Sequence, residues 1–255
     1  MGFDERAGHP VSRLEIGGPS PAFIASLGCE FEVRTFGSSP RVFTTQLLFV
    51  PPAAAPVIVW HSGSLQCLEA ELTPWAAAVI TGTFPRDWPR EATPLYEMSP
   101  DIAMEVESDL IGIRRFPERF DALDRYFGAR IQSELRSTPG ELRWAWNELA
   151  TRGGNVAIRD LALQVGWSRR HFITRFKDCM GLAPKESARS WRFQRARNLL
   201  AKDTASIAEV ASAVGYSDQS HLTREFRELG RCTPAAFRSI RFANLPGIPA
   251  EAAGF

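Results

Sequence analysis

The chain has 255 residues, of which 44% are hydrophobic, and a formal net charge of +1. A chain of this size can bury one large core or two smaller ones, and we expect two domains. It has no apolar run of about 18 residues and no basic-then-apolar signal at residues 1–10, so we expect a cytoplasmic protein without a membrane-spanning helix.

The cysteines give no sign of a metal site or of a disulfide framework. They are scattered along the chain, without a C-x-x-C pair, at Cys29, Cys67, Cys179 and Cys232. We therefore expect reduced thiols inside hydrophobic cores.

The small net charge hides a polarity along the chain. Residues 152–242 carry 17 basic and 8 acidic side chains, a net +9, whereas residues 1–151 carry 13 basic and 20 acidic ones, a net −7. A basic segment favours a polyanionic partner, because contacts with phosphates release counterions. Charge bias alone also occurs on ordinary solvated surfaces, so it indicates nucleic acid only together with a second signal.

The N-terminal part is predicted to be a small β-rich domain. Short alternating or apolar runs, broken by Gly and Pro, cover residues 31–33, 46–50, 57–60 and 65–72. We interpret them as strands of a small antiparallel sheet. The turn residues 61–64 (HSGS) predict a hairpin between the third and fourth runs.

Helices are predicted to follow these strands at residues 75–81 and 101–110, and an amphipathic helix at 117–136. In the amphipathic helix, apolar side chains recur at steps of three and four, at Phe120, Leu123, Phe127, Ile131 and Leu135. Such a stripe packs into a domain core or forms a dimer seam, and the core is the commoner case. We expect an N-terminal domain at 1–136, a linker at 137–140, a C-terminal domain at 141–243 and an irregular tail at 244–255.

The C-terminal part contains one pattern twice. Residues 156–168 pair with residues 205–217 at an offset of 49, which matches Gly166 with Gly215. Further along, the offset is 50, which matches His171 with His221, so the second copy has one extra residue at its turn. This repetition predicts two units of the same structure.

Each copy describes a helix-turn-helix unit: a short apolar-faced helix, a glycine, an aromatic residue, a serine cap and a second amphipathic helix. Gly166 and Gly215 end the first helices, and we expect a positive φ at both. A helix predicted at 184–201 separates the two copies. It would place the two second helices roughly one DNA turn, about 34 Å, apart.

The predicted DNA-binding residues lie at the caps and on the outer faces of the second helices, where they offer guanidinium, amide and hydroxyl groups to base edges and phosphates. In the first copy they are Ser168, Arg169, Arg170, Ile173, Thr174 and Arg175; in the second they are Ser217, Asp218, Gln219, Ser220, Thr223 and Arg224. One such helix is compatible with an ordinary polar surface. Two copies at one spacing in the basic part of the chain favour double-stranded DNA as the partner.

Residues 207–226 (IAEVASAVGYSDQSHLTREF) with 233–237 (TPAAF) resemble the signature of the AraC/XylS family, and residues 165–176 resemble the first unit of that family. The resemblance covers about residues 144–242. It implies a seven-helix domain with two lobes joined by a long helix, and promoter binding with activation of transcription through RNA polymerase. By position it assigns base-facing or backbone-facing roles to Arg170, Ile173, Thr174, Gln219, Ser220 and Arg224. Ile173 departs from the polar residue often found at its position; it either contacts a thymine methyl or packs inward.

The first 135 residues are only loosely similar to the sensory or dimerisation part of such regulators, whose sheet is cupin-like. The overall fold class expected is α+β: a small β-rich N-terminal domain with helices, then an all-α C-terminal domain with two tandem helix-turn-helix units.

An enzyme is one alternative, because a cupin-like sheet can hold a metal through His and Glu side chains. Only His9 and His61 lie in the acidic part, without an H-x-H pair, and we interpret His61 as a turn residue. A zinc-held reactive cysteine would need four clustered cysteines, and a nucleophilic triad would need a G-x-S-x-G elbow. The sequence therefore predicts no catalytic residue, metal site or cofactor.

A second alternative is a regulator without a ligand, in which the N-terminal domain only forms a homodimer. Three tryptophans in the sheet-rich part, Trp60, Trp75 and Trp88, are instead compatible with an apolar pocket for a small-molecule effector. The sequence leaves effector binding and dimerisation open.

Overall fold

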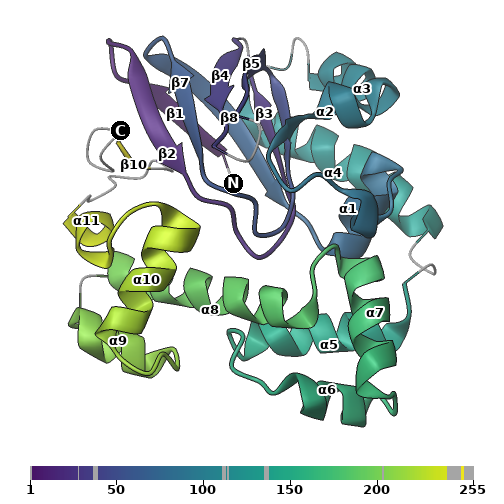
Figure 1. The fold of residues 1–255 in the computed structure, drawn as a ribbon. Helices are drawn as coiled ribbons and strands as arrows, with labels where there is room; N and C mark the ends of the chain where they lie inside the picture. Colours follow the sequence, from purple (N-terminus) through teal and green to yellow (C-terminus); the bar gives the residue numbers. More distant parts are fainter. Residues whose placement is uncertain are drawn as a thin grey trace.

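The computed structural model describes residues 2–27, 29–36, 40–110, 113, 115–134, 138–202, 204–239 and 248–249. Figure 1 shows a β-rich N-terminal part and an all-helical C-terminal part, which confirms the predicted α+β class. None of the helices in these ranges combines the length and apolarity that a membrane span requires.

The strands of the described chain form two antiparallel five-stranded sheets, where the sequence predicts one small sheet. The first sheet has, in order, β1 (Gly2–Arg6), β8 (Ser64–Glu71), β3 (Ala22–Ser26), β6 (Leu47–Val50) and β9 (Thr93–Pro94). The second has β10 (Ile248–Pro249), β2 (Val11–Glu15), β7 (Val57–His61), β4 (Phe31–Arg34) and β5 (Val42–Thr45). All four predicted strands are present as β4, β6, β7 and β8.

The predicted hairpin between β7 and β8 is wrong, because the two strands belong to different sheets. The chain crosses from one sheet to the other at this turn, where Gly63 has φ +109° and a Cβ would lie 2.4 Å from the His9 carbonyl oxygen, so only glycine fits there. His61 is the last residue of β7 and only 2% exposed, not a residue of an open turn. Its Nε2 lies 3.1 Å from a carboxylate oxygen of Glu5, and burial lowers the pKa of His61.

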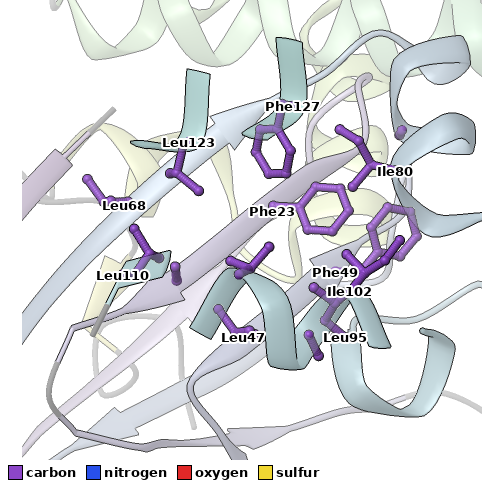
Figure 2. Close-up of a cluster of buried hydrophobic side chains, with 14 of the residues drawn as sticks. Phe23, Leu47, Phe49, Leu68, Ile80, Leu95, Ile102, Leu110, Leu123 and Phe127 are labelled. Carbon is purple, nitrogen blue, oxygen red and sulfur yellow. The ribbon is translucent and has the colours of Figure 1, made fainter. Parts of the chain in front are cut away.

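Helices cover the outer face of the first sheet: α1 (Pro74–Thr81), η1 (Pro85–Asp87), α2 (Leu95–Met98), α3 (Pro100–Leu110) and α4 (Phe116–Glu134). Figure 2 shows Leu123 and Phe127 of α4 pointing at Phe23 and the rest of the buried cluster. The amphipathic stripe of α4 is therefore core where it is described. The side chain of Ile131 and all of Leu135 lie outside the described residues.

The helical part contains, in its described residues, the seven helices that the family resemblance implies. They are α5 (Gly140–Thr151), α6 (Ile158–Gln164), α7 (Arg169–Met180), α8 (Pro184–Ala201), α9 (Ile207–Ala213), α10 (Gln219–Gly230) and α11 (Pro234–Ser239). We call α5–α7 lobe 1 and α9–α11 lobe 2. Figure 1 shows α8 running from one lobe to the other.

The C-terminal tail returns to the N-terminal domain. Ile248 and Pro249 pair with Leu14 and Arg13 of β2, so the expectation of an irregular tail is wrong for these two residues. The other residues of 244–255 lie outside the described ranges, as does Ser137 of the predicted linker.

Candidate nucleic-acid interface

The turn of lobe 1 directs the start of α7 outward. Gly166 has φ +72°, as expected, and the amide of Trp167 donates to the Ala162 carbonyl at 3.0 Å, which closes the end of α6. The Ser168 hydroxyl then accepts from the amide of His171 at 3.3 Å and caps α7. This confirms the predicted serine cap in the first copy.

The turn of lobe 2 has the same course, with one residue more. Gly215 has φ +83°, but the cap of α10 is Asp218, whose carboxylate accepts from the His221 amide at 2.6 Å. The predicted serine cap is therefore wrong here: Ser217 instead donates to Asp218 at 3.2 Å. The hydrogen bond from the His221 amide lowers the pKa of Asp218. The extra residue seen in the sequence offset thus replaces a neutral cap by a charged one.

A histidine packs on the turn aromatic in both lobes. The rings of Trp167 and His171 are 4.8 Å apart, and those of Tyr216 and His221 are 5.0 Å apart, both edge-to-face. The two histidines that the repeat matches therefore have the same packing role in both lobes.

The predicted site residues lie along the first turns and outer faces of α7 and α10. Ten are exposed: Ser168, Arg169, Arg170, Thr174, Arg175, Ser217, Asp218, Gln219, Ser220 and Arg224. Ile173 and Thr223 are half-buried, and the Thr223 hydroxyl donates to the Gln219 carbonyl at 2.8 Å. The helix α7 carries four basic and one acidic side chain, while α10 carries two of each.

An ion-pair network anchors α10 to α8. Arg189 of α8 donates to Glu225 at 2.9 Å and to Glu228 at 2.8 Å. The hydrogen bonds to Glu228 and Glu225 raise the pKa of Arg189, and Arg189 in turn lowers the pKa of Glu228. Sequence reasoning missed these residues. The available signal was the i, i+3 spacing of the two glutamates, which places them on one side of α10.

Lobe 1 rests against α1 and η1 of the N-terminal domain. A Cβ added at Gly181, which ends α7, would lie 3.0 Å from the Pro85 carbonyl oxygen and 3.1 Å from the Trp88 ring. The ring of Trp75 contacts Trp146 of α5 edge-to-face at 5.4 Å, and Trp146 contacts Trp191 of α8 at 5.5 Å. The sequence associates Trp75 and Trp88 with an apolar pocket, whereas in the structure they pack in the domain junction and the core.

Lobe 2 is held by a different part of the same domain. Arg197 donates to the Ile16 carbonyl at 3.1 Å, and Arg231 donates to the Phe36 carbonyl at 3.3 Å while lying 4.7 Å from the Phe36 ring centre. Leu14 of β2 belongs to the same buried cluster as the lobe 2 core. The N-terminal domain thus contacts both lobes, a non-local arrangement that no local pattern predicts.

The N-terminal core contains a hollow lined only by apolar side chains. It lies between the first sheet and α2–α4 and has a cavity volume of only about 10 Å³, roughly the space that one water molecule needs. Phe23, Leu47, Leu95, Val106 and Leu123 are among its lining residues.

Comparison with known proteins follows the helical part. A family model described as a helix-turn-helix domain matches residues 161–240. The probable transcription factor PqrA of Proteus vulgaris is 33% identical over 97 residues, which are 38% of this chain and 79% of that protein. The F1 operon positive regulatory protein of Yersinia pestis is 33% identical over 93 residues, 36% of this chain and 31% of that protein. The chain thus spans less than a third of this second relative.

A solved structure is similar over both parts. The crystal structure of ToxT from Vibrio cholerae covers 94% of this chain and 97% of its own, with a TM-score of 0.54 and 9% identity. At that identity the likeness concerns the fold alone.

Proposed function

Because the chain belongs to the AraC/XylS family of transcriptional regulators, we propose that it binds two adjacent major-groove segments of one DNA duplex through α7 and α10. The observation that carries this proposal is the pair of equivalent lobes on one rigid connector. The connector α8 has 18 residues, so it is about 27 Å long. Two readers that enter successive major-groove segments on one face of a duplex need a spacing of about one DNA turn, about 34 Å, which is of the same order as this connector length.

The proposed roles of the site residues follow from their positions. Base edges are assigned to the six positions that match the family pattern, Arg170, Ile173, Thr174, Gln219, Ser220 and Arg224. Phosphate and sugar contacts are assigned to Ser168, Arg169, Arg175, Ser217 and Thr223. Asp218 is assigned to positioning, because its carboxylate is already engaged as the cap of α10.

The proposed direction of control is activation. The usual role of the family supports it, as does the name of the F1 operon positive regulatory protein. Activation requires a contact with RNA polymerase, which makes that enzyme the second proposed partner.

The N-terminal domain is proposed to restrain the two lobes. Its α1 and η1 pack on lobe 1, while Ile16 and Phe36 hold Arg197 and Arg231 near lobe 2. A small apolar effector, or a second copy of the chain, would act through these contacts. The hollow under α4 has a volume of about 10 Å³, so an effector would have to displace core side chains to bind there. The stripe of α4 is buried in the core where it is described, which argues against a dimer seam made by that stripe.

The proposal that α7 and α10 bind two adjacent DNA segments can be tested by selecting random duplex DNA with the full chain at near-physiological salt. We expect an enriched site with two short blocks about one helical turn apart. Arg224→Ala should relax preference at one base position within one block and leave the other block intact. Enrichment of a single block, or only salt-sensitive binding without enrichment, would contradict two working readers.

The restraint has its own test. Trp75→Ala combined with Arg231→Met removes one contact at each lobe. We expect the variant to bind sites whose spacer is shortened or lengthened by a base pair nearly as well as the selected site, while the natural chain discriminates. If both proteins tolerate altered spacers equally, the proposed restraint by the N-terminal domain is wrong, while the proposal that α7 and α10 bind DNA is unaffected.

A further inference from the structure

Two of the four thiols share one environment. Cys67 of β8 lies in the buried cluster between the two sheets, and Cys29 packs against the same cluster. The other two cysteines are in the helical part, Cys232 in the lobe 2 core and Cys179 beside the lobe 1 core. Cys29 and Cys67 are therefore the pair that the fold brings together.

The hydroxyl of Ser26 contacts both thiols. Ser26 is the cross-strand partner of Cys67, and its hydroxyl is a hydrogen-bond partner of that thiol. The same hydroxyl donates to the Cys29 carbonyl at 2.5 Å and lies 3.8 Å from the Cys29 sulfur. The Cys29 sulfur reaches the Ser64 carbonyl of β8 at 3.5 Å.

The two thiols differ in access to solvent. Cys29 is half-buried at a turn, whereas Cys67 is 1% exposed, and burial raises the pKa of its thiol. A reagent from solution therefore meets Cys29 first. Cys67 is shielded from external reagents, but its thiol and the Cys29 sulfur share the Ser26 hydroxyl as a neighbour.

We propose that Cys29 and Cys67 form a reversible disulfide with a small-molecule disulfide as oxidant. The Cys29 thiolate attacks one sulfur of the oxidant, forms a mixed disulfide and releases one small thiolate. Cys67 then loses its proton to water and attacks the Cys29 sulfur, which expels the second small thiolate. Two protein thiols are oxidised, and one oxidant molecule is reduced to two thiols.

The bond would join the sheets at one end. Cys29 lies two residues before the start of β4 of the second sheet, and Cys67 belongs to β8 of the first sheet. The bond would close a long loop in the unfolded chain and so reduce its conformational entropy. The folded state should therefore be more stable relative to the unfolded state.

Full-length protein equilibrated in oxidised and reduced glutathione mixtures tests the proposal. After quenching and alkylation, peptide mass spectrometry should show residues 29 and 67 cross-linked, with reversal by dithiothreitol. The melting temperature should rise by several degrees on oxidation. Cys179→Ser should behave like the natural chain, whereas Cys29→Ser, at a partly exposed turn, should lose both the cross-link and the shift.

Three results would overturn the proposal: reaction that stops at glutathione on Cys29, a bond between two chains, or free Cys29 and Cys67 at every ratio. Cys67→Ala gives a second check, because it should accumulate the mixed disulfide at Cys29. Thermal unfolding of the reduced Cys67→Ala variant shows whether it is folded before its reaction is compared with that of the natural chain.

Discussion

Lobe 1 and lobe 2 have the same backbone course, yet their recognition helices differ in charge. The helix α7 has an excess of three basic side chains, whereas the charges of α10 balance. Phosphate contacts depend on net positive charge, while base reading depends on the placement of a few polar groups. From this difference we propose that the two copies of one repeated unit divide the work, with lobe 1 supplying more affinity and lobe 2 more discrimination.

The lobes differ also in what holds the recognition helix. The end of α7 rests on η1 of the N-terminal domain, and Ser168 caps its start. The helix α10 is tied to α8 through Arg189 and capped by the charged Asp218. Lobe 2 therefore depends on ionic contacts that lobe 1 lacks at the equivalent cap.

Removal of a central phenylalanine has the largest expected effect and tests whether the lobes are independent. Phe226 lies 4.8 Å from the Phe193 ring and 5.6 Å from the Phe237 ring, and Phe172 is its fully buried counterpart in lobe 1. Each Phe→Ala change should cost about 3–5 kcal/mol of stability. Hydrogen exchange should show lost protection in α10 for Phe226→Ala and in α7 for Phe172→Ala. Equal loss in both helices would mean that α8 couples the lobes into one unit.

Arg189→Met should come next, since it leaves Glu225 buried without its cation. We expect a loss of about 2–3 kcal/mol, below the value for a fully buried pair because Arg189 is one-third exposed. Thermal unfolding measures it, and Arg189→Met with Glu225→Met should recover most of the loss. The difference in stability between this variant and the natural chain should become smaller in acid. Arg189 lowers the pKa of Glu228, so the stabilisation by this ion pair is present above the unfolded-state pKa of Glu228. It is lost as the pH falls through the folded-state pKa. A gap independent of pH would contradict this contribution.

Arginine substitutions on the two helices should separate affinity from discrimination. Arg224→Ala is expected to weaken specific binding by about 1–3 kcal/mol and to relax preference at one base position. Arg169→Ala should weaken binding to all sequences and reduce the salt slope by about 1. Titrations with the selected site and a scrambled duplex at several salt concentrations measure both. Uniform loss for both variants would remove the proposed division of work.

The caps should give the smallest difference. Ser168→Ala is expected to cost about 1 kcal/mol at any pH, because a hydroxyl cap does not titrate. The pKa of Asp218 is lower in the folded than in the unfolded state, so its capping contribution is present above the unfolded-state pKa. It is lost as the pH falls through the folded-state pKa. Exchange of the His221 amide should therefore quicken in acid relative to that of the His171 amide. Asp218→Ser is the matched control, and it should abolish this difference.

Local signals were enough to predict the two lobes. Periodic apolar positions and the glycines at 166 and 215 specify helices and turns within a few residues, and the predicted contact residues do lie on outer faces. That they contact DNA stays a prediction. The strands β1 and β2 were missed, because Asp4, Glu5 and Arg13 interrupt their apolar alternation.

Contacts between distant segments had no local signal. Arg197 meets Ile16 across 181 positions of sequence, and the backbone of Gly63 lies close against that of His9. Pairings of this kind are decided by the packing of whole domains. The hairpin prediction failed for the same reason. Turn residues indicate that the chain changes direction, but they do not indicate with which strand the next segment pairs.

The tryptophans at the domain junction also make the molecule its own optical probe. The indoles of Trp75, Trp146 and Trp191 stand edge-to-face in a row from α1 through α5 to α8. Electronic transitions of indoles this close couple, and the resulting circular dichroism couplet changes sign and size with the angle between the rings. A shift of the N-terminal domain relative to lobe 1, whether caused by an effector, an oxidant or DNA, would therefore register as a spectral change in the unlabelled protein.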